Sequence, residues 1–231
     1  MFGKNKIKIR TAKIEDIPQI LEVEKVTWGE GGAATKEVFE SRIKIFPEGT
    51  LIALVEKKIV GVVATQIIDY NGNPKNLYEM TDNGCITKTH NPKGDTIYGV
   101  DLSVHPLYQN KGVGKKLLES IGKLVVRYNL KQCMLGGRVP YYYKFADEIK
   151  IEDYVNIEKQ KGGNSIPPDP ELSFYRKFGL RVAKIIPDYF KDPDSLNYGV
   201  LLIRKNPFYN KWYRWIVVLI FTLIIDKILK S

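Results

Sequence analysis

The fold is decided by the stretch Val100-Asp-Leu-Ser-Val-His-Pro-Leu-Tyr-Gln-Asn-Lys-Gly-Val-Gly-Lys-Lys-Leu-Leu118. Its first residues are typical of a β-strand, and Pro106 then favours a turn because proline lacks a backbone N–H. Gly112 and Gly114 allow positive φ angles and a close approach of the backbone to a ligand. Apolar residues recur at helical spacing after the glycines. The stretch therefore predicts a strand, an open glycine turn and a helix in succession.

This turn has the chemistry of an anion site. The amides at the start of the helix have no intrahelical acceptor, and they lie at the positive end of the helix dipole. Lys111 and Lys115 add full positive charges. A pyrophosphate is the ligand that suits such a turn best. The glycines alone would also suit any tight strand-to-helix turn, and the lysines alone a solvated helix face. The turn is not a P-loop, and its glycine spacing does not fit the dinucleotide fingerprint.

The rest of the chain predicts an α/β (α+β) fold with alternating short strands and helices. The 231 residues, 44% apolar and 27% charged, suit one large folded domain. We expect two long connections, over 69–95 and 136–170, the second forming a lid or a dimer contact. The expected strands are Ile7–Arg10, Leu51–Val55, Ile59–Ile68, Ile97–Val104, Cys133–Leu135, Val182–Ile186 and Tyr198–Arg204. We expect a first helix to begin near Asp16, a second to run over Lys36–Ile45, a third to start at Gly112, and a fourth to run over Leu172–Phe178.

Composition excludes several classes of protein. Two cysteines exclude a disulfide scaffold, and two histidines make a metal centre an unfavourable interpretation, so we expect no metal. The net charge of +10 favours anionic partners. Nucleic acid ranks last among these, because the lysines are scattered and form no stripe with interleaved aromatic residues. The basic start has no apolar core, which argues against a secretory signal and for a cytoplasmic protein.

The C-terminal end differs from the rest. We divide the chain into a domain over 1–207 and a basic, apolar tail over 208–231. Trp215–Ile225 is apolar around every face of a helix, but it is shorter than the about twenty residues that span a bilayer. The longer stretch Trp212–Leu229 would place tryptophans and a tyrosine at a membrane interface. The alternative is a helix buried against the domain or a partner chain.

Several separated motifs, in order, resemble the GNAT superfamily of N-acetyltransferases from about Ile7 to about Pro207. The central one is Gln109-x-x-Gly112-x-Gly114 after Val104-His-Pro106, which looks like the family's coenzyme A loop. Others resemble the acetyltransferase module that is sometimes fused to a carbon–nitrogen hydrolase. These are Glu40-Ser-Arg-Ile-Lys-Ile-Phe-Pro-Glu-Gly49, Gly94-Asp-Thr-Ile-Tyr-Gly-Val-Asp101, Gly136-Gly-Arg-Val-Pro140, and Pro187-Asp-Tyr with Ser195-Leu-Asn-Tyr-Gly199. Three further motifs resemble the superfamily as a whole, namely Ile9-Arg-Thr-Ala12, Glu15-Asp-Ile-Pro18 and Phe174-Tyr-Arg-Lys-Phe-Gly-Leu180.

The resemblance implies a mixed, mostly antiparallel sheet of six to seven strands that splays open at an acetyl-CoA cleft after the fourth strand, with helices on both faces. The pantetheine arm would pair with the backbone of Leu102, Ser103 and Val104. The pyrophosphate would be held by the turn residues, which are Gln109, Asn110, Lys111, Gly112, Val113, Gly114 and Lys115.

The resemblance also implies direct attack of a primary amine on the thioester of acetyl-CoA, the co-substrate. Tyr175 stands where the family often places the tyrosine that protonates the coenzyme A sulfur. Asp101 lies where many members carry an acid, and it could accept the amine proton directly or through water. The alternatives are a core tyrosine and a structural acid. Asp101 and Ser103 share one face of the strand, opposite Leu102 and Val104.

The acceptor is not identified by the sequence. Glu22, Glu24, Glu30 and the tyrosines Tyr141 to Tyr143 could meet a cationic amine, although such residues are more often surface or packing residues. A second function remains open, namely a GNAT-like module that binds acyl-CoA, or tethers a partner to a membrane, without turnover. A homodimer is compatible with either interpretation.

Overall fold

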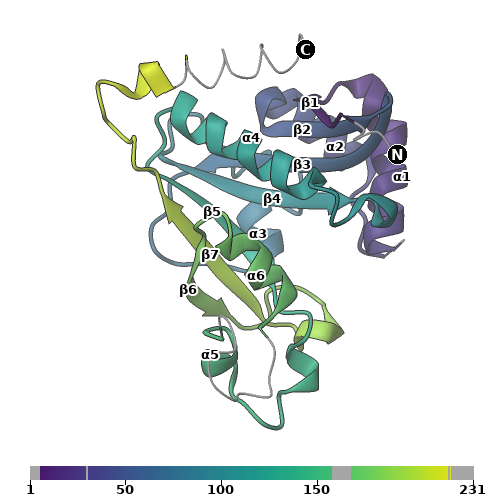
Figure 1. Cartoon of the computed structure of the whole chain (residues 1–231), viewed down its shortest axis with the longest axis vertical. Coiled ribbons are helices and arrows are strands. Elements are labelled where there is room, and N and C mark those ends of the chain that lie inside the picture. The colour runs from purple at the N-terminus through teal and green to yellow at the C-terminus, as the bar shows by residue number, and fades with distance from the viewer. Residues whose placement is uncertain (1–5, 30, 158–167, 218, 220–231) are drawn as a thin grey trace.

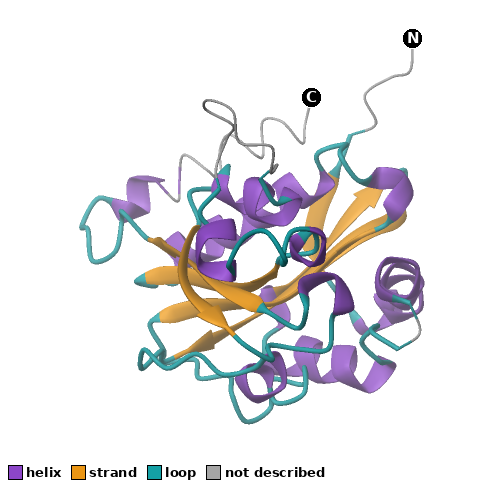
Figure 2. Cartoon of the chain, turned by 90° about the horizontal axis from the view of Figure 1, so that it is seen from below, coloured by secondary structure: helices purple, strands orange, loops and turns teal. Residues whose placement is uncertain are grey.

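The computed structural model describes residues 6–29, 31–157, 168–217 and 219. These residues form one seven-stranded sheet in the order β1-β2-β3-β4-β5-β7-β6. Figure 1 shows α4 and α6 in front of the sheet, and Figure 2 shows helices on both of its sides. The mixed, mostly antiparallel sheet of six to seven strands is confirmed.

Most elements lie within a few residues of their predicted bounds. The strands are β1 (Lys8–Thr11), β2 (Thr50–Val55), β3 (Lys58–Ile68), β4 (Thr96–Val104), β5 (Gln132–Arg138), β6 (Arg181–Ile186) and β7 (Gly199–Lys205). The α-helices are α1 (Ile17–Trp28), α2 (Lys36–Ile45), α3 (Leu77–Thr81), α4 (Val113–Arg127), α5 (Ile151–Tyr154) and α6 (Pro170–Arg176).

The sheet opens between β4 and β5, as predicted. These two strands pair in parallel from Thr96 opposite Gln132 to Gly99 opposite Leu135. Both then continue, β4 to Val104 and β5 to Arg138, without further pairing to each other in the described register. A bulge in the β3–β4 ladder lies at the same point, because the register shifts between Ala64 and Thr65. The backbone of β4 beyond the bulge is therefore an open edge on the β5 side.

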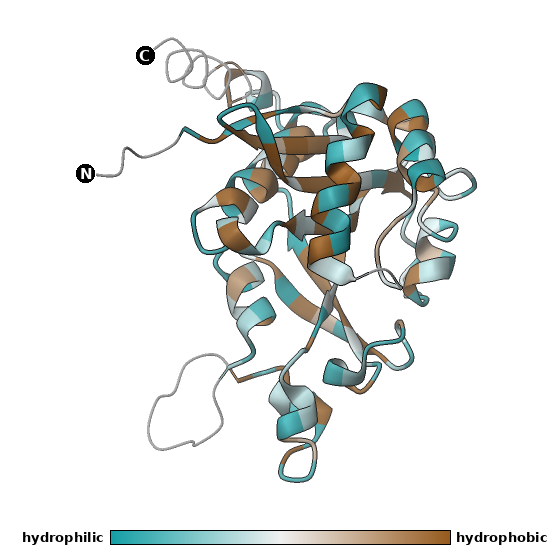
Figure 3. Ribbon diagram, turned by 90° about the vertical axis from the view of Figure 1, so that its right-hand side faces the viewer, coloured by the Kyte–Doolittle hydropathy of each residue, from teal (hydrophilic) through white to brown (hydrophobic). Residues whose placement is uncertain are grey.

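The two faces of β4 meet different partners. Val104 packs near Gly114 at the start of α4, so Leu102 and Val104 face the α4 side. Asp101 and Ser103 contact α2 and α1, through Arg42 and Trp28 respectively. Buried apolar side chains pack on both faces of the sheet. In Figure 3, much of the ribbon of the strands has the hydrophobic colour. The fully buried members of the core include Ile52, Ile97, Leu117 and Met134.

Two regions depart from expectation. The connection after β3 contains the short helix α3, whose first turn is capped by Asn76, with its side chain accepting from the Glu79 amide. Strand β5 extends past the predicted Cys133–Leu135 to Arg138, although glycines disfavour strands. Gly136 is required there because a Cβ would lie 1.7 Å from the Tyr189 hydroxyl. Residues 158–167 of the long insertion lie outside the described residues.

The tail is described only at its start. Within the part of the chain that the structure describes, no helix has the length and apolar character needed to cross a bilayer. Most of the apolar stretch Trp215–Ile225 lies outside that part, so the division at residue 207 and the membrane contact of Trp212–Leu229 remain predictions.

Candidate active site

The glycine turn leads directly into the first residues of α4. Gly112 is the N-cap residue, with φ of 88°, and no side chain caps this helix. That angle lies in the left-handed region, which glycine adopts without strain. The amides of Val113, Gly114 and Lys115 begin the helix and have no intrahelical acceptor. Gly112 and Lys115 are exposed, Gly114 is partly buried and Val113 is buried, so the start of the helix lies only in part at the protein surface.

Local contacts hold the turn against the end of β4. The Gln109 side-chain amide donates to the Val104 carbonyl over 3.2 Å. His105 Nδ1 accepts from the Leu107 amide at 3.2 Å, a structural role that agrees with its place before Pro106. Asn110, with φ of 58°, supplies a further left-handed residue. The turn is thus fixed by its own backbone and short side chains.

The two turn lysines have separate surroundings. The Lys111 ammonium lies 5.4 Å from the centroid of the Tyr108 ring. Lys115 is exposed and forms an ion pair of 3.8 Å with Glu119, one turn further along α4. Both lysines lie at the positive end of the helix, where they add to the attraction for an anion.

Tyr175 is placed by α6, which packs against the turn. A Cβ at Gly114 would lie 3.1 Å from the Phe174 ring, so the glycine allows α6 to come close. Tyr175 itself is 8% exposed and lies beside Gly137 of β5. Burial raises its pKa well above the usual value, and the neighbouring Glu171 charge acts in the same direction. The phenol therefore keeps its proton at neutral pH.

Asp101 lies in a buried ion pair. Arg42 Nη1 donates to Asp101 Oδ2 over 2.8 Å, and both side chains are almost fully buried. The Ser103 hydroxyl donates to Asp101 Oδ1 over 3.2 Å and accepts from Trp28 Nε1 over 2.6 Å. Asp101 is therefore paired with Arg42, and its predicted role as the base stays a prediction.

Glu24 of α1 faces the same cluster. It is 1% exposed, and its Oε2 accepts from the Ala34 amide over 3.2 Å. Its Oε1 is buried without a hydrogen-bond partner. Desolvation, followed by the Asp101 charge, raises the pKa of Glu24 to about 8. A carboxyl group poised near neutral pH is a suitable proton acceptor.

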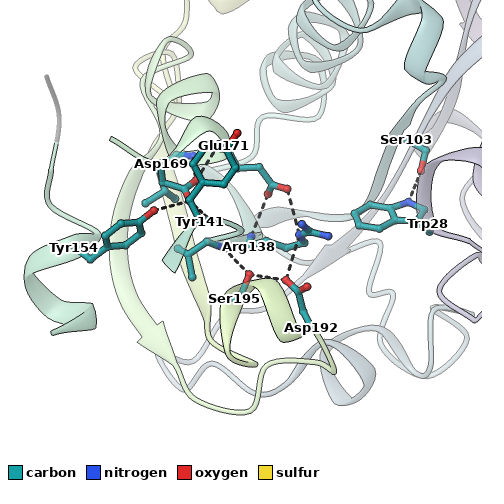
Figure 4. A network of polar contacts seen from close by, with 11 residues as sticks. Trp28, Ser103, Arg138, Tyr141, Tyr154, Asp169, Glu171, Asp192 and Ser195 are labelled. Carbon is teal, nitrogen blue, oxygen red and sulfur yellow. Dashed lines mark hydrogen bonds and ion pairs between the residues drawn. The ribbon is translucent and has the colours of Figure 1, made fainter. Parts of the chain in front are cut away.

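A second cluster lies across the opening, at the end of β5. Arg138 Nε lies 3.3 Å from both Glu171 Oε1 and Asp192 Oδ2. Its guanidinium also lies 5.4 Å from the centroid of the Trp28 ring, which joins the two clusters (Figure 4). The acidic side chains outnumber the guanidiniums in this combined network. Its members are Glu24, Trp28, Arg42, Asp101, Ser103, Arg138, Glu171 and Asp192.

The other residues considered for an acceptor lie further from this network. Glu22 is exposed on α1, and Glu30 lies outside the described residues. Tyr142 is buried and packs against Tyr154, whereas Tyr141 and Tyr143 are exposed and flank the Lys144 ammonium. Of these six candidates, Glu24 is the one that joins the buried charges.

Comparison with known proteins decides the family. A model described as "Acetyltransferase (GNAT) family" matches residues 15–140. The chain is 40% identical over 179 residues to a Bacillus subtilis protein called "Uncharacterized N-acetyltransferase YkwB", covering 77% of each chain. The chain belongs to the GNAT acetyltransferase family. By family it is an acyltransferase, which confirms the resemblance drawn from the glycine turn.

Other relatives add detail to the GNAT assignment. The chain is 32% identical over 206 residues to "Probable hydrolase YhcX" of Bacillus subtilis, covering 88% of this chain but only 39% of that protein. This agrees with the likeness to a module fused to a hydrolase. The loading GNATL domain of CurA from Lyngbya majuscula has a TM-score of 0.74 at 25% identity, covering 87% of this chain and 98% of that one. The GphF GNAT-like decarboxylase in complex with isobutyryl-CoA has a TM-score of 0.69 at 25% identity, with 86% and 98% covered.

The predicted residues fall into two groups. Those assigned to the cofactor lie together, on the open edge of β4 and the adjoining turn. Asp101 and Tyr175 lie on opposite sides of the sheet opening, toward α2 and within α6 respectively. The sequence analysis missed Arg42, Trp28 and Glu171 as members of the site. A buried charge among apolar helix positions, such as Arg42 in α2, is the signal that could have indicated them.

Proposed function

We propose that this GNAT protein transfers an acetyl group from acetyl-CoA to a primary amine, by direct attack in a ternary complex. The observation that carries the proposal is the combination of two features at one point. Pairing of β4 with β5 stops at Gly99, and the partly exposed start of α4 lies at the end of the same strand. A long thioester nucleotide needs both an open strand edge and an anion site.

The cofactor would be bound mainly by backbone. The pantetheine amides would pair with the open edge of β4 at Leu102, Ser103 and Val104. The pyrophosphate would accept from the amides of the turn, which comprises Gln109, Asn110, Lys111, Gly112, Val113, Gly114 and Lys115. An isobutyryl-CoA complex of GphF, which shares this fold, supports a CoA thioester as the co-substrate.

The chemical step requires two proton transfers. The neutral amine nitrogen attacks the thioester carbonyl, the C–N bond forms, and the C–S bond breaks with departure of the thiolate. We assign the proton lost by the nitrogen to the facing carboxyl groups of Glu24 and Asp101. Glu24 is the better acceptor of the two, because its pKa of about 8 contrasts with an Asp101 already neutralised by Arg42.

Tyr175 would then protonate the departing sulfur. Its buried phenol is neutral at the pH at which Glu24 loses its proton, so the acid and the base coexist in their active forms. Trp28 and Ser103 would act by positioning, since their hydrogen bond joins α1 to β4.

The charge balance indicates a cationic acceptor. Arg42 and Arg138 are each already paired with carboxylates, and Glu24 and Glu171 leave an excess of acid. Above its pKa of about 8, Glu24 is ionised, and an amine that arrives as an ammonium ion would then be attracted by this excess and could lose its proton to Glu24. A substrate carboxylate would find both guanidiniums occupied.

The test is release of coenzyme A thiol from acetyl-CoA across a panel of primary amines, with mass spectrometry of the acetylated product. We expect turnover with at least one amine and little thiol release without amine. Tight acetyl-CoA binding without turnover on any amine would instead support the module that only binds acyl-CoA. Release of CO2 from a carboxyacyl-CoA would point to decarboxylation, the reaction named for GphF.

A further inference from the structure

A second cavity lies along α4, beyond the turn. Its volume is about 820 Å³, and it is bordered by β1, by most of α4 and by the end of β7. The floor is apolar and includes Ile9, Leu51, Leu118, Ile121 and Leu124. We call this cavity the α4 groove. It does not include the glycine turn, Tyr175 or any member of the buried charge network.

Cations surround the groove. The lining includes only two acidic residues, Glu48 and Glu119, and Glu119 is also the partner of Lys115. The basic lining residues are Lys6, Lys8, Arg10, Lys116, Lys123, Arg127, Arg204 and Lys205. Several of these are exposed at the rim, namely Lys6, Lys8, Arg127 and Lys205. An apolar floor under a basic rim suits an anionic amphiphile.

Two of the basic lining residues, Lys116 and Lys123, lie on α4 between the exposed rim and the apolar floor. The Lys116 ammonium donates to the Ile7 carbonyl over 3.2 Å, which fixes α4 against the start of β1. Lys123 is partly buried, and desolvation lowers its pKa. Its ammonium is therefore partly desolvated in the folded chain. This arrangement favours an incoming anion as a replacement for water.

Exposed apolar residues continue from the groove. Pro207 and Phe208 line its end, and the chain then runs into a segment with large apolar side chains at the surface. Trp212 is 83% exposed and Trp215 is 55% exposed. Ile216 and Leu219 are exposed by 50% and 60%. Tryptophans beside aliphatic residues are typical of the interfacial region of a bilayer.

We propose that the α4 groove and the described residues 207–217 together bind the surface of an anionic phospholipid bilayer, with an acyl chain in the groove and lipid phosphates at the basic rim. Arg10 of the basic lining is already paired with Asp16. A zwitterionic surface or a neutral apolar peptide would bring no net negative charge to the exposed Lys6, Lys8 and Lys205, so charge complementarity selects an anionic occupant. The site lies away from the transferase residues, so the proposal does not depend on the proposed function.

The experiment is co-sedimentation of the full chain with vesicles of phosphatidylcholine alone and of phosphatidylcholine mixed with phosphatidylglycerol. We expect binding to the mixed vesicles that weakens as salt is raised. Lys8→Glu combined with Lys205→Glu should weaken it by about tenfold or more, because two attractive charges become repulsive. The matched control is Lys88→Glu with Lys93→Glu, two exposed lysines that do not line the groove.

A substitution at a residue that lines the groove tests whether vesicle binding uses the groove itself and not only the positive charge around it. Gly122 lines the groove and is exposed, and a Cβ there would meet no atom within 4 Å. Gly122→Phe therefore places a bulky side chain at the groove, and Gly122→Ala is its small control. We expect Gly122→Phe to lose vesicle binding and Gly122→Ala to keep it. Equal binding to both vesicle types, no binding at all, equal losses in the two lysine pairs, or full binding by Gly122→Phe would each overturn the proposal.

Discussion

Strand β4 takes part in two regions that would bind different ligands. The cofactor face comprises its open edge and the turn before α4, and the acceptor face comprises the buried side chains toward α1 and α2. At its edge toward β5, the strand offers unpaired backbone groups, and its end leads into a turn whose donors are main-chain amides. Toward α1 and α2, it offers Asp101 and Ser103 to a network of buried side chains that begins with Arg42 and Trp28. The bulge opposite Ala64 and Thr65 lies where these two arrangements begin.

The difference concerns what each ligand requires. Acetyl-CoA carries the same phosphates and amides for every enzyme that uses it, so backbone groups suffice and side chains can vary around the glycines. An acceptor amine must be selected by charge and must lose a proton, which needs titratable side chains in a dry environment. Substitutions on the two faces should therefore separate cofactor affinity from turnover.

The largest separation is expected for Glu24→Gln. Loss of the proton acceptor should lower kcat by about 10²- to 10⁴-fold, while the Kd for acetyl-CoA stays unchanged. Steady-state kinetics and calorimetric titration measure the two quantities. Glu22→Gln, an exposed change on the same helix, is the control and should retain full activity. An unchanged kcat in Glu24→Gln would leave Asp101 as the base.

Breaking the Arg42–Asp101 ion pair should lower the free energy of unfolding without removing a contact to the cofactor. Arg42→Met leaves the buried Asp101 carboxylate without its partner, which costs about 3–5 kcal/mol in comparable buried pairs. Urea denaturation measures this loss, and Lys44→Met in the last turn of the same helix is the control. If Arg42→Met unfolds at the wild-type urea concentration, the pair does not stabilise this face.

Tyr175→Phe tests the leaving-group side. Without the phenolic proton, kcat should fall by about 10²-fold, the lower end of the effect of a general acid, and acetyl-CoA should bind as before. Tyr143→Phe, at an exposed tyrosine, should have no effect. The assignment also requires the deficit to shrink with a thioester whose thiol is more acidic, and an undiminished deficit would indicate a packing role.

The pH dependence tests the same carboxyl group of Glu24. Turnover should rise as pH passes through about 8, because the deprotonated form of Glu24 is the active one. The unfolded chain releases this proton near pH 4.3, so the folded state binds more protons between the two values. The free energy of unfolding should therefore fall as pH rises across that interval, and Glu24→Gln should flatten the fall. Equilibrium denaturation at several pH values, with both proteins, measures the slope.

The cofactor face could be predicted from the sequence because its signals are local. Gly112, Pro106 and the apolar repeat of α4 lie within one short stretch, and each constrains the backbone directly. The bounds of most strands could also be predicted from local signals, but the end of β5 could not. There Gly136 and Gly137 concealed a strand whose glycines make room for the side chains of Tyr189 and Leu202.

The acceptor face could not be predicted in the same way. Glu24, Arg42 and Arg138 are far apart in the chain, and their meeting depends on how α1, α2 and β5 pack. Glu24 follows Ile17 and Ile20 at the spacing of a buried helix face, but spacing does not show which groups its carboxyl group would meet. The raised pKa of Glu24 is a property of tertiary burial.

The central claim is that backbone amides at the start of α4 hold the pyrophosphate of acetyl-CoA. Calorimetric titration of acetyl-CoA into Gly112→Asp tests it most directly, with Gly122→Asp further along the same helix as the control. The account predicts a Kd raised roughly 10- to 100-fold or more in Gly112→Asp, because hydrogen bonds to a charged group are lost and a like charge is added. It predicts wild-type affinity in Gly122→Asp. Wild-type affinity in a folded Gly112→Asp protein would contradict it.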